Sequence, residues 1–360
     1  MKTKSFWRLM TMAVVAVVCA GFVSCSSDDD GGNSGNGTSL NGGNGLTTPK
    51  YESVSALYTI TEDAEDAPSI HSIELTASGD YVVILNEEVS SPDYPYYAKK
   101  RGNYMKFIPK NLLTRVTIDN IIHGKYTQID DTTFDLEGWG IVKITGSANN
   151  AVSITVTPKD SNEPYTVTAA RKNQLPESSL TSKICRTWDI SSLRITIEFL
   201  GREMFNKEYT MAQYPTQVVA DLVEWAKKME EMYGEDDDDE YDDDYDDDFD
   251  FDMDESTKPE QIIFTKAGTY MVKYANETLA LSTWSWKDES KGILTYSWNY
   301  DSMDYWYEAG NVTVAFRGDQ LAISESSYDK EHYYDDNDYY DDEDYDEPNF
   351  IITYYMNEVK

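Results

Sequence analysis

The sequence predicts a mainly β protein with two antiparallel β domains, the second with eight strands in sequence order and one inserted helix. Two observations carry this prediction. Short runs of alternating apolar residues recur from residue 51 onward, and Gly, Asn and Asp separate them. One segment, residues 215–233, instead repeats its apolar residues at helical spacing. The predicted domains are residues 51–172 and 180–360, with a boundary near 172–179.

The N-terminal domain shows strand patterns and no helical pattern. The runs that predict its strands are 54–58, 73–75, 81–83, 116–118, 141–144, 152–156 and 165–169. The second domain is patterned more clearly, because its runs are longer and tight Gly turns separate several of them. Its predicted strands are 184–199, 261–265, 269–274, 279–286, 293–298, 312–316, 320–324 and 350–356.

The two domains share a sequence pattern. Residues 73–83 and 262–272 are identical at five of eleven positions, and both predict a strand, a glycine turn and a second strand. A second, weaker match pairs 134–139 with 279–284, at a different spacing. A diverged tandem repeat and a chance similarity are both open at this point.

The N-terminus resembles the signal segment of bacterial lipoproteins. A basic start precedes an apolar run from Leu9 to Val23, which is too short to span a bilayer. The run ends in Phe22-Val-Ser-Cys25, which is similar to a lipobox. This resemblance implies that residues 1–24 are a signal peptide and that Cys25 becomes the lipid-bearing, palmitoylated N-terminus. Residues 25–50 are then the anchor and a flexible Gly/Asn tether, since 11 of the 15 residues in 31–45 are Gly or Asn.

The acidic residues after Cys25, in 26–30, resemble the surface-export signal of Bacteroidota lipoproteins. The resemblance implies an outer-membrane location with the protein facing the cell exterior. Cys25 and a discarded Cys19 leave Cys185 alone, so we expect no disulfide within the chain. Cys185 lies in an apolar run, and we expect a buried, inert thiol.

Residues 184–358 resemble the lipocalin-like domains of Bacteroidota lipoproteins. The features that carry the resemblance are Trp188, Phe-Thr-Lys-Ala-Gly-Thr-Tyr at 264–270, Ser-Thr-Trp-Ser-Trp at 282–286, and the run at 312–321. The resemblance implies a small up-and-down barrel, no enzymatic activity and no defined ligand. The chain departs from the pattern at Arg186, where such domains usually carry Gly, and in the first connection, where it inserts a helix and an acidic tract.

An eight-stranded meander brings alternate connections to the same end. The tight turns at 267–268, 287–292 and 318–319 then share one end, while three longer connections share the other. We therefore expect one mouth rich in acidic and tyrosine residues and one compact end. Loops gathered at one end of a rigid scaffold are where binding sites usually lie.

The formal net charge of −36 is concentrated in two insertions of the second domain. Residues 235–255 hold 16 acids and 329–347 hold 11, with one base, Lys330. These tracts argue against nucleic acid and anionic lipid surfaces as partners, because like charges repel.

The acidic tracts have three open interpretations: hydrated surface segments, a diffuse cation site, or a docking site for a basic protein surface. The oxygen ligands of the cation hypothesis are Asp248, Asp250, Asp252, Asp254 and Glu255, and Ca²⁺ is its candidate ion. The segment is no EF-hand, because Met253 occupies the position of the loop glycine. No other cofactor is expected.

Tryptophans are the second set of candidate contacts. Trp284 and Trp286 lie two residues apart on a predicted strand, and Trp298 lies on the next. Stacked tryptophans can bind sugar rings, but packing inside the barrel is the favoured interpretation. The best candidates for exposed ligand contact are Trp306 and its neighbours Tyr305 and Tyr307, in the connection at 299–310.

The sequence does not predict an enzyme. The three histidines, His71, His123 and His332, are isolated, and no nucleophile elbow, phosphate loop or spaced metal motif occurs. The leading function is a surface-exposed binding module for divalent cations, glycans or basic protein surfaces. The alternatives are a carrier of a small apolar ligand inside the barrel and an accessory lipoprotein of a surface glycan-uptake system. A basic stretch at 99–115 could also dock on the acidic mouth within one chain.

Overall fold

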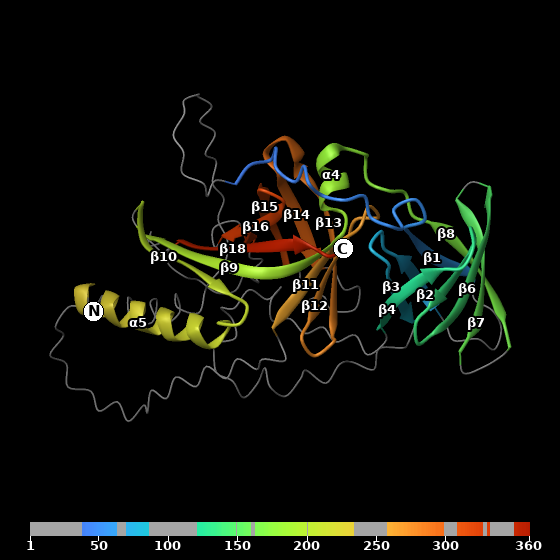
Figure 1. Ribbon diagram of the computed structural model, residues 1–360, viewed down its shortest axis with the longest axis horizontal. Helices are drawn as coiled ribbons and strands as arrows, with labels where there is room; N and C mark the ends of the chain where they lie inside the picture. The colour runs from blue at the N-terminus through green and yellow to red at the C-terminus, as the bar shows by residue number, and fades with distance from the viewer. Residues whose placement is uncertain are drawn as a thin grey trace, which may run out of the picture.

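The computed structural model describes residues 38–62, 70–85, 121–148, 150–159, 163–199, 201–233, 258–298, 308–326, 330–331 and 349–360. Within these residues the chain forms two closed antiparallel barrels, each of eight strands, side by side (Figure 1). The predicted fold class is therefore confirmed. Of the helices in this part of the chain, none has the length and apolar character needed to cross a membrane.

The first barrel, called barrel 1, is a meander in which each strand pairs with the next and β8 closes on β1. Its strands are β1 (Ala56–Glu62), β2 (Ile70–Leu75), β3 (Asp80–Leu85), β4 (Ile121–Gln128), β5 (Thr133–Leu136), β6 (Gly140–Ala148), β7 (Ala151–Pro158) and β8 (Tyr165–Arg171). Alternate residues such as Ile73, Leu75 and Val83 fill its interior, as the period of two along a strand requires. The sequence did not predict β4, which carries Gly124 at an inward position, or β5, which is only four residues long. The predicted strand at 116–118 lies outside the described residues.

The second barrel, called barrel 2, also follows sequence order and closes where β18 pairs with β9. Its strands are β9 (Thr187–Phe199), β11 (Pro259–Phe264), β12 (Thr269–Tyr274), β13 (Leu279–Asp288), β14 (Ile293–Trp298), β15 (Glu308–Arg317), β16 (Gln320–Ser326) and β18 (Asn349–Glu358). A two-residue strand, β17 (Lys330–Glu331), pairs with β15. These eight barrel strands are the ones that the sequence predicted.

Two details of the first strand region differ from the prediction. The segment predicted to begin a strand at Ile184 begins with a helix, α4 (Ser179–Ile184), capped by the Ser178 side chain. Cys185 ends this helix rather than lying in a strand, and it is buried as expected. The sequence also missed β10 (Arg202–Thr210), which forms a hairpin with β9 outside the barrel. Charged residues dominate β10, so it lacks the alternation that marks a half-buried strand.

The predicted helix is present as α5 (Thr216–Tyr233). Val218, Leu222 and Trp225 form its buried face and belong to the hydrophobic core of barrel 2. Trp225 meets Phe350, near the start of β18, edge to face with ring centroids 6.0 Å apart. Helical spacing in the sequence therefore identified both the helix and the face that it buries.

The predicted strand–turn–strand match is confirmed in atomic detail. In barrel 1, the Thr76 amide donates to the Asp80 carbonyl at 2.8 Å, and the Asp80 amide donates to Thr76 Oγ1 at 2.9 Å. In barrel 2, Thr265 and Thr269 make the same two bonds, at 3.0 and 3.1 Å. The two turns connect equivalent strands, β2–β3 and β11–β12.

The glycine of each turn plays the same part. Gly79 and Gly268 both have a left-handed backbone, with φ of 88° and 80°. Their carbonyls accept from the amides of Tyr126 at 2.8 Å and Trp284 at 2.9 Å. Tyr126 lies on β4 and Trp284 on β13, the fourth strand of each barrel. This agreement supports a tandem repeat.

The second sequence match, between 134–139 and 279–284, does not join equivalent strands of the two barrels. Residues 134–139 lie on β5 and in the turn after it, in the fifth strand region of barrel 1. Residues 279–284 lie on β13, the fourth barrel strand of barrel 2. The similarity of apolar spacing is therefore coincidental, since strands on equivalent faces share the same period of two.

Residues 38–50, called the strap, do not form the flexible tether that the sequence predicted. Ser39 makes a complete antiparallel bridge with Phe316 of β15, with N–O distances of 2.8 and 2.9 Å. Leu40 and Leu46 pack against the core of barrel 2. Figure 1 shows the strap in blue, passing beside α4 on its way to barrel 1. Gly and Asn are frequent in the strap because its backbone lies close to barrel 2.

The two barrels meet through an apolar contact. Val82 of β3 packs in one cluster with Ile263, Met271, Leu279 and Leu281 from β11–β13. These are outward-facing positions of both barrels, since their neighbours in sequence face the two interiors. The basic stretch considered for docking, at 99–115, lies outside the described residues. The described part of the interface thus has an apolar centre, and at least one ion pair lies beside it, between Lys266 and Glu52 at 2.8 Å.

Polar groups surround this apolar contact. The Thr187 amide donates to Ser78 Oγ at 2.9 Å, and Thr187 Oγ1 donates to Asp80 at 2.8 Å. His123 Nε2 lies 2.8 Å from the Glu277 carbonyl oxygen, and burial lowers the pKa of this imidazole. His123 is therefore a neutral interface donor, and its role here is structural.

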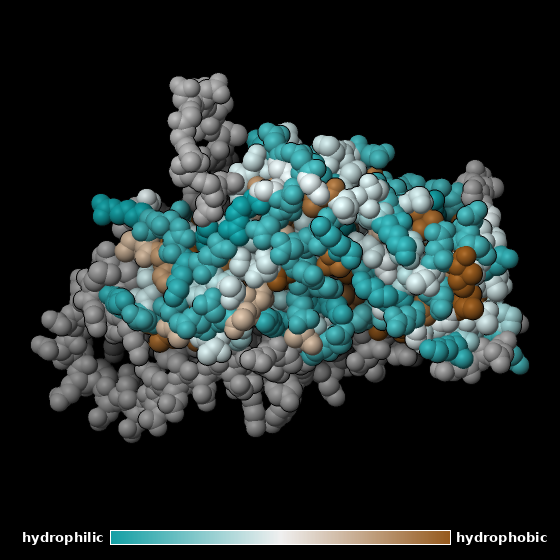
Figure 2. Space-filling model, in the orientation of Figure 1, coloured by the Kyte–Doolittle hydropathy of each residue, from teal (hydrophilic) through white to brown (hydrophobic). Residues whose placement is uncertain are grey.

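The face of the molecule shown in Figure 2 is mostly hydrophilic, and its apolar side chains lie in small separate groups. Among the described residues, the large apolar side chains with high exposure are Ile129 and Ile141, at 57% and 42%. Both belong to barrel 1, one directly after β4 and one on β6. Scattered apolar residues of this kind are ordinary on protein surfaces, so the described part of this face does not suggest an apolar docking surface.

Candidate binding end of the second barrel

The strand order gives barrel 2 two different ends. At one end, called the closed end, β11–β12, β13–β14 and β15–β16 are joined by short turns, one containing the 3₁₀ helix η3 (Glu289–Lys291). At the other end, called the mouth, β9, β12, β14 and β16 finish and β11, β13, β15 and β18 begin. Three connections at the mouth are long and span 200–258, 299–307 and 327–348, and the fourth is the short turn at 275–278. The predicted gathering of the long connections at one end is thus confirmed by the topology.

The sequence places both acidic tracts and the aromatic cluster in these connections. The candidate cation ligands Asp248, Asp250, Asp252, Asp254 and Glu255 lie outside the described residues, as do Tyr305, Trp306, Tyr307 and Cys25. Within the described part, no three or more His, Cys, Asp or Glu side chains are grouped as a metal site would require. The cation hypothesis therefore remains a prediction about the mouth.

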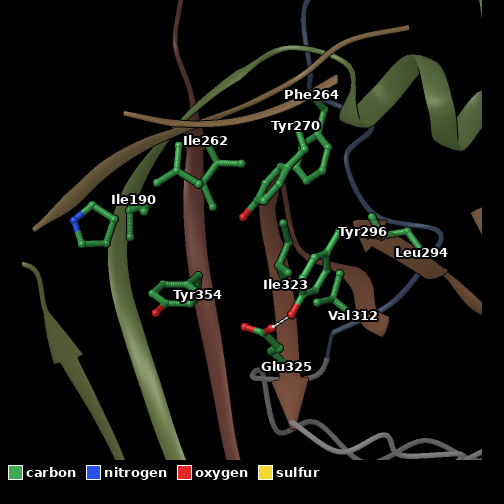
Figure 3. A pocket seen from close by; sticks show the side chains of 12 residues that line it. Ile190, Ile262, Phe264, Tyr270, Leu294, Tyr296, Val312, Ile323, Glu325 and Tyr354 are labelled. Carbon is green, nitrogen blue, oxygen red and sulfur yellow. Dashed lines mark hydrogen bonds between the residues drawn. The ribbon is translucent and has the colours of Figure 1, made fainter. Parts of the chain in front are cut away.

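A small cavity lies inside barrel 2 (Figure 3). Its volume is about 20 Å³, which is enough for about one water molecule and too small for a hydrocarbon chain. The residues that line it are Ile190, Pro259, Ile262, Phe264, Tyr270, Val272, Leu294, Tyr296, Val312, Ile323, Glu325 and Tyr354. Phe264 and Tyr270 flank the closed-end turn, whereas Pro259 and Glu325 lie near the mouth.

Glu325 is the acidic residue of this lining. It is 4% exposed, and Tyr296 Oη donates a hydrogen bond to its Oε1 at 2.6 Å. β16 sends Leu321, Ile323 and Glu325 to the barrel interior at alternate positions. The strand therefore introduces a carboxylate where the alternation would otherwise place an apolar side chain.

Two further tyrosines surround the same space. In Figure 3 the side chains of Tyr270 and Tyr354 lie around the cavity that Glu325 and Tyr296 also line. Burial raises the pKa of Tyr270 well above its ordinary value, and the negative charge of Glu325 raises it further. The pKa of Tyr354 is raised for the same principal reason, burial. Both phenols therefore stay protonated at neutral pH and can donate hydrogen bonds.

These residues could have been found from the sequence, although they were not singled out. Tyr270 continues the inward alternation with Val272 and Tyr274, and Glu325 ends the alternation of Leu321 and Ile323. A polar residue at an inward position of a barrel strand is the available signal. This signal was not recognised at Glu325 because the chain contains many other acidic residues.

The tryptophans proposed for sugar stacking are core residues where the structure describes them. Trp284 is 4% exposed, and its indole N–H donates to the Thr265 carbonyl at 3.2 Å. Trp286 packs partly buried against the same core and donates to Thr181 Oγ1 of α4 at 2.8 Å. The favoured interpretation, packing inside the barrel, is confirmed for both. The side chain of Trp298 lies outside the described part.

Barrel 2 thus encloses a small cavity that one buried carboxylate, Glu325, and three tyrosines line together with apolar residues. Comparison with family models, with curated proteins and with solved structures finds no match to this chain.

Proposed function

We propose that this protein is a lipid-anchored binding protein of the outer membrane, facing the cell exterior, and that it acts without catalysis. The anchor is Cys25, on the strength of the lipobox-like segment that ends there and the acidic residues that follow it. The binding end is the mouth of barrel 2. A non-enzymatic role fits the lack of any catalytic sequence motif.

The observation that carries the proposal is the strand order of barrel 2. It brings the ends of three long connections to one mouth, and the sequence gives two of them 27 acidic residues in the tracts 235–255 and 329–347 (16 + 11). So many like charges at one end attract counterions and positively charged partners. The third connection contributes Tyr305, Trp306 and Tyr307, which suit contact with a ligand.

The partners that fit this chemistry are divalent cations, with Ca²⁺ as the first candidate, and basic protein surfaces. Glycans fit through the aromatic residues and through Ca²⁺-bridged hydroxyls. Carboxylates at 248, 250, 252, 254 and 255 supply oxygen ligands of the kind that Ca²⁺ takes in sets of about 6–8.

A second candidate is a ligand held inside barrel 2, and the cavity favours it in a particular form. The lining combines apolar residues with Glu325 and three tyrosines. Such a lining suits a small ligand with a positive or hydrogen-bonding head better than a purely apolar chain. Mass spectrometry of organic extracts of the purified protein tests this candidate, and a bound hydrophobic molecule without polar groups would favour the apolar carrier instead.

Calorimetric titration of the soluble protein, residues 26–360, with Ca²⁺ tests the cation proposal. We expect binding in the micromolar to millimolar range that weakens with salt. The matched control carries Asp248, Asp250, Asp252 and Asp254→Asn with Glu255→Gln, and it should bind less Ca²⁺. No heat of binding at millimolar Ca²⁺ in the parent protein would refute the proposal.

The aromatic part of the mouth has its own test. Trp306→Ala should leave the folded state intact, because the residue belongs to a connection and not to a barrel strand. It should weaken binding of a ligand that uses the mouth by about 1 kcal/mol or more, as truncated interface tryptophans do. Trp284→Ala is the contrasting variant, since that side chain is buried and its loss should lower stability. If the parent protein and Trp306→Ala bind the ligand with equal affinity, Trp306 is not part of the binding site.

A further inference from the structure

The strap is attached to the closed end of barrel 2 by a series of backbone contacts. Beyond the bridge between Ser39 and Phe316, the Gly43 amide donates to the Gly318 carbonyl at 2.8 Å. The Gly45 amide donates to Asp319 Oδ1, also at 2.8 Å. Gly318 and Asp319 form the β15–β16 turn, which belongs to the closed end. The strap therefore follows this end of the barrel and not its mouth.

A buried ion pair holds the next part of the strap. Arg186 and Glu358 pair with side chains 5% and 8% exposed, at the start of β9 and the end of β18. Thr47 joins them: its amide and hydroxyl donate to the Glu358 carboxylate at 3.2 and 2.8 Å, and its carbonyl accepts from Arg186 at 2.7 Å. Lys183 of α4 donates to the Gly42 carbonyl at 2.7 Å. The strap, α4 and both end strands are thus tied together.

The glycines of the strap fit this close approach. A Cβ on Gly42 would lie 2.4 Å from Phe316 Cβ and 2.8 Å from the Gly318 carbonyl oxygen. Real side chains do not tolerate such distances. The small residues here are required by the packing of the backbone against the barrel, so this segment is a fixed part of barrel 2.

We infer that the anchored protein stands with the closed end of barrel 2 nearest the membrane and with its mouth pointing away from it. This inference rests on the proposed lipid anchor at Cys25. Only 13 residues, 26–38, separate Cys25 from the bridge at Ser39. Chain length alone limits the distance that 13 residues can bridge to at most about 45 Å. The mouth lies one strand length beyond the closed end, about 20 Å farther for a strand of this kind.

The end of barrel 2 that this orientation turns toward the exterior is the mouth. The membrane side receives the β11–β12, β13–β14 and β15–β16 turns and the strap. The orientation therefore links the anchor to the proposed binding end, because the strap is held at the end of barrel 2 opposite to the mouth.

Energy transfer to lipid measures the orientation. The natively lipidated protein is reconstituted into phosphatidylcholine vesicles that contain an acceptor dye on a lipid head group. A donor dye is placed at the closed end through Lys291→Cys, or next to the mouth through Arg202→Cys. Both side chains are exposed. Cys185 does not compete for the dye, because it is buried and burial raises the pKa of its thiol.

We expect transfer from residue 291 to be at least twice as strong as transfer from residue 202. Equal transfer, or stronger transfer from residue 202, would overturn the orientation. A variant with about 20 flexible residues inserted between 37 and 38 should lower both signals and narrow their difference.

A separate measurement isolates the anchor. Cys25→Ser should abolish lipid attachment, seen by mass spectrometry, and abolish vesicle binding. If the parent protein itself carries no lipid, the proposed anchor fails, whatever the orientation of the barrel. If the parent is lipidated and binds vesicles but the two labels transfer equally, the anchor stands and the orientation alone is wrong.

Discussion

At the residue scale, Arg186 shows how one buried side chain can connect segments that are far apart in the sequence. In the folded chain its guanidinium pairs with Glu358 and also donates to the carbonyls of Thr47, Lys183 and Ser182. One side chain therefore joins the strap, α4 and the last strand. No rule of local sequence could have predicted this, since its partners lie up to 172 residues away.

Replacing Arg186 tests the importance of this ion pair. Arg186→Met should destabilise barrel 2 by about 3–5 kcal/mol, because it leaves the Glu358 carboxylate buried without its partner. It should also increase hydrogen exchange in residues 38–50. The measurement is urea unfolding combined with hydrogen exchange.

Two control variants define the result. Arg186→Met with Glu358→Met should recover much of the lost stability, because no buried charge is left alone. Lys228→Met breaks an exposed pair with Glu224, whose side chains are 63% and 66% exposed, and should cost well under 1 kcal/mol. Unchanged exchange in the strap of Arg186→Met would contradict the role given to this residue.

The residues around the cavity illustrate a different limit of sequence reasoning. Apolar alternation, which reports which face of a strand is inside, predicted that Trp284 and Trp286 pack against the barrel core. It predicted the burial of Cys185 for a wrong reason, since Cys185 ends α4 and does not lie in a strand. Glu325 and Tyr296 were not recognised, because alternation alone does not show that two side chains on different strands meet. Their 2.6 Å hydrogen bond depends on the closure of the sheet.

At the element scale, the clearest result is that the β2–β3 and β11–β12 hairpins have the same turn geometry and the same backbone hydrogen bonds. The sequence match covered the threonine, the glycine and the tyrosine of each turn, and the structure gives each threonine and glycine the same backbone bonds. The second proposed match failed because it rested on apolar spacing alone, which any two strands share. Shared turn geometry is therefore a better guide to repetition here than shared hydrophobicity.

Glycine substitution compares the two hairpins. Gly79→Ala and Gly268→Ala should each cost about 1–2 kcal/mol, because both positions have a left-handed backbone that L-residues disfavour. A Cβ would also lie 2.9 Å from the Tyr51 ring at Gly79 and 3.1 Å from the Trp284 carbonyl oxygen at Gly268. Thermal unfolding of the two variants gives the comparison.

Gly201→Ala is the matched control, since Gly201 has φ of 71° and a Cβ added there would meet no atom of the described residues within 4 Å. It should cost less than either hairpin variant. If both hairpin variants lower the free energy of unfolding by no more than Gly201→Ala does, the close packing of the two turns does not contribute to stability.

The strap and β10 were beyond the reach of sequence patterns for physical reasons. Gly and Asn favour flexible linkers on average, but they also allow a backbone to lie directly on a packed surface. In β10, exposed charged residues are held in a strand by pairing with β9 and by contacts such as the Tyr209 hydroxyl with Asp221 of α5, at 2.8 Å. Tertiary contacts, not local preference, decide both elements.

At the scale of the whole molecule, the two barrels are joined by an interface that contains a buried acid. Glu74 of β2 is 4% exposed, and its Oε1 has no hydrogen-bond partner in the described part of the chain. Burial raises the pKa of Glu74, and hydrogen bonds from Thr265 and Thr269 and the charge of Lys172 oppose this only in part. A carboxyl group with one unpaired oxygen is more easily kept neutral than charged in such a place.

The sign of the resulting pH dependence follows from the raised pKa. The folded state holds the Glu74 proton more tightly than the unfolded state, whose pKa is near the ordinary 4.5. The stability from the neutral group is therefore complete below about pH 4.5 and is lost as pH rises through the folded-state pKa.

Glu74→Gln should raise the melting temperature at pH 8 and flatten its dependence on pH above 4.5, as measured by calorimetry. Glu52→Gln is the control for a partly exposed interface acid, which pairs with Lys266 at 2.8 Å. Glu52→Gln should not flatten the dependence of the melting temperature on pH above 4.5. A parent protein whose stability is constant from pH 4.5 to 8 would contradict the account of Glu74.

The central claim is that the mouth of barrel 2 is the binding end, and hydrogen exchange with and without Ca²⁺ tests it most directly. We predict that Ca²⁺ protects the mouth ends of β16 and β18, near Ser326 and Asn349, and leaves the closed-end turn at Gly268 unchanged. The variant with Asn and Gln at 248, 250, 252, 254 and 255 should lose this protection. No change at the mouth at millimolar Ca²⁺, or the same change in that variant, would contradict the claim.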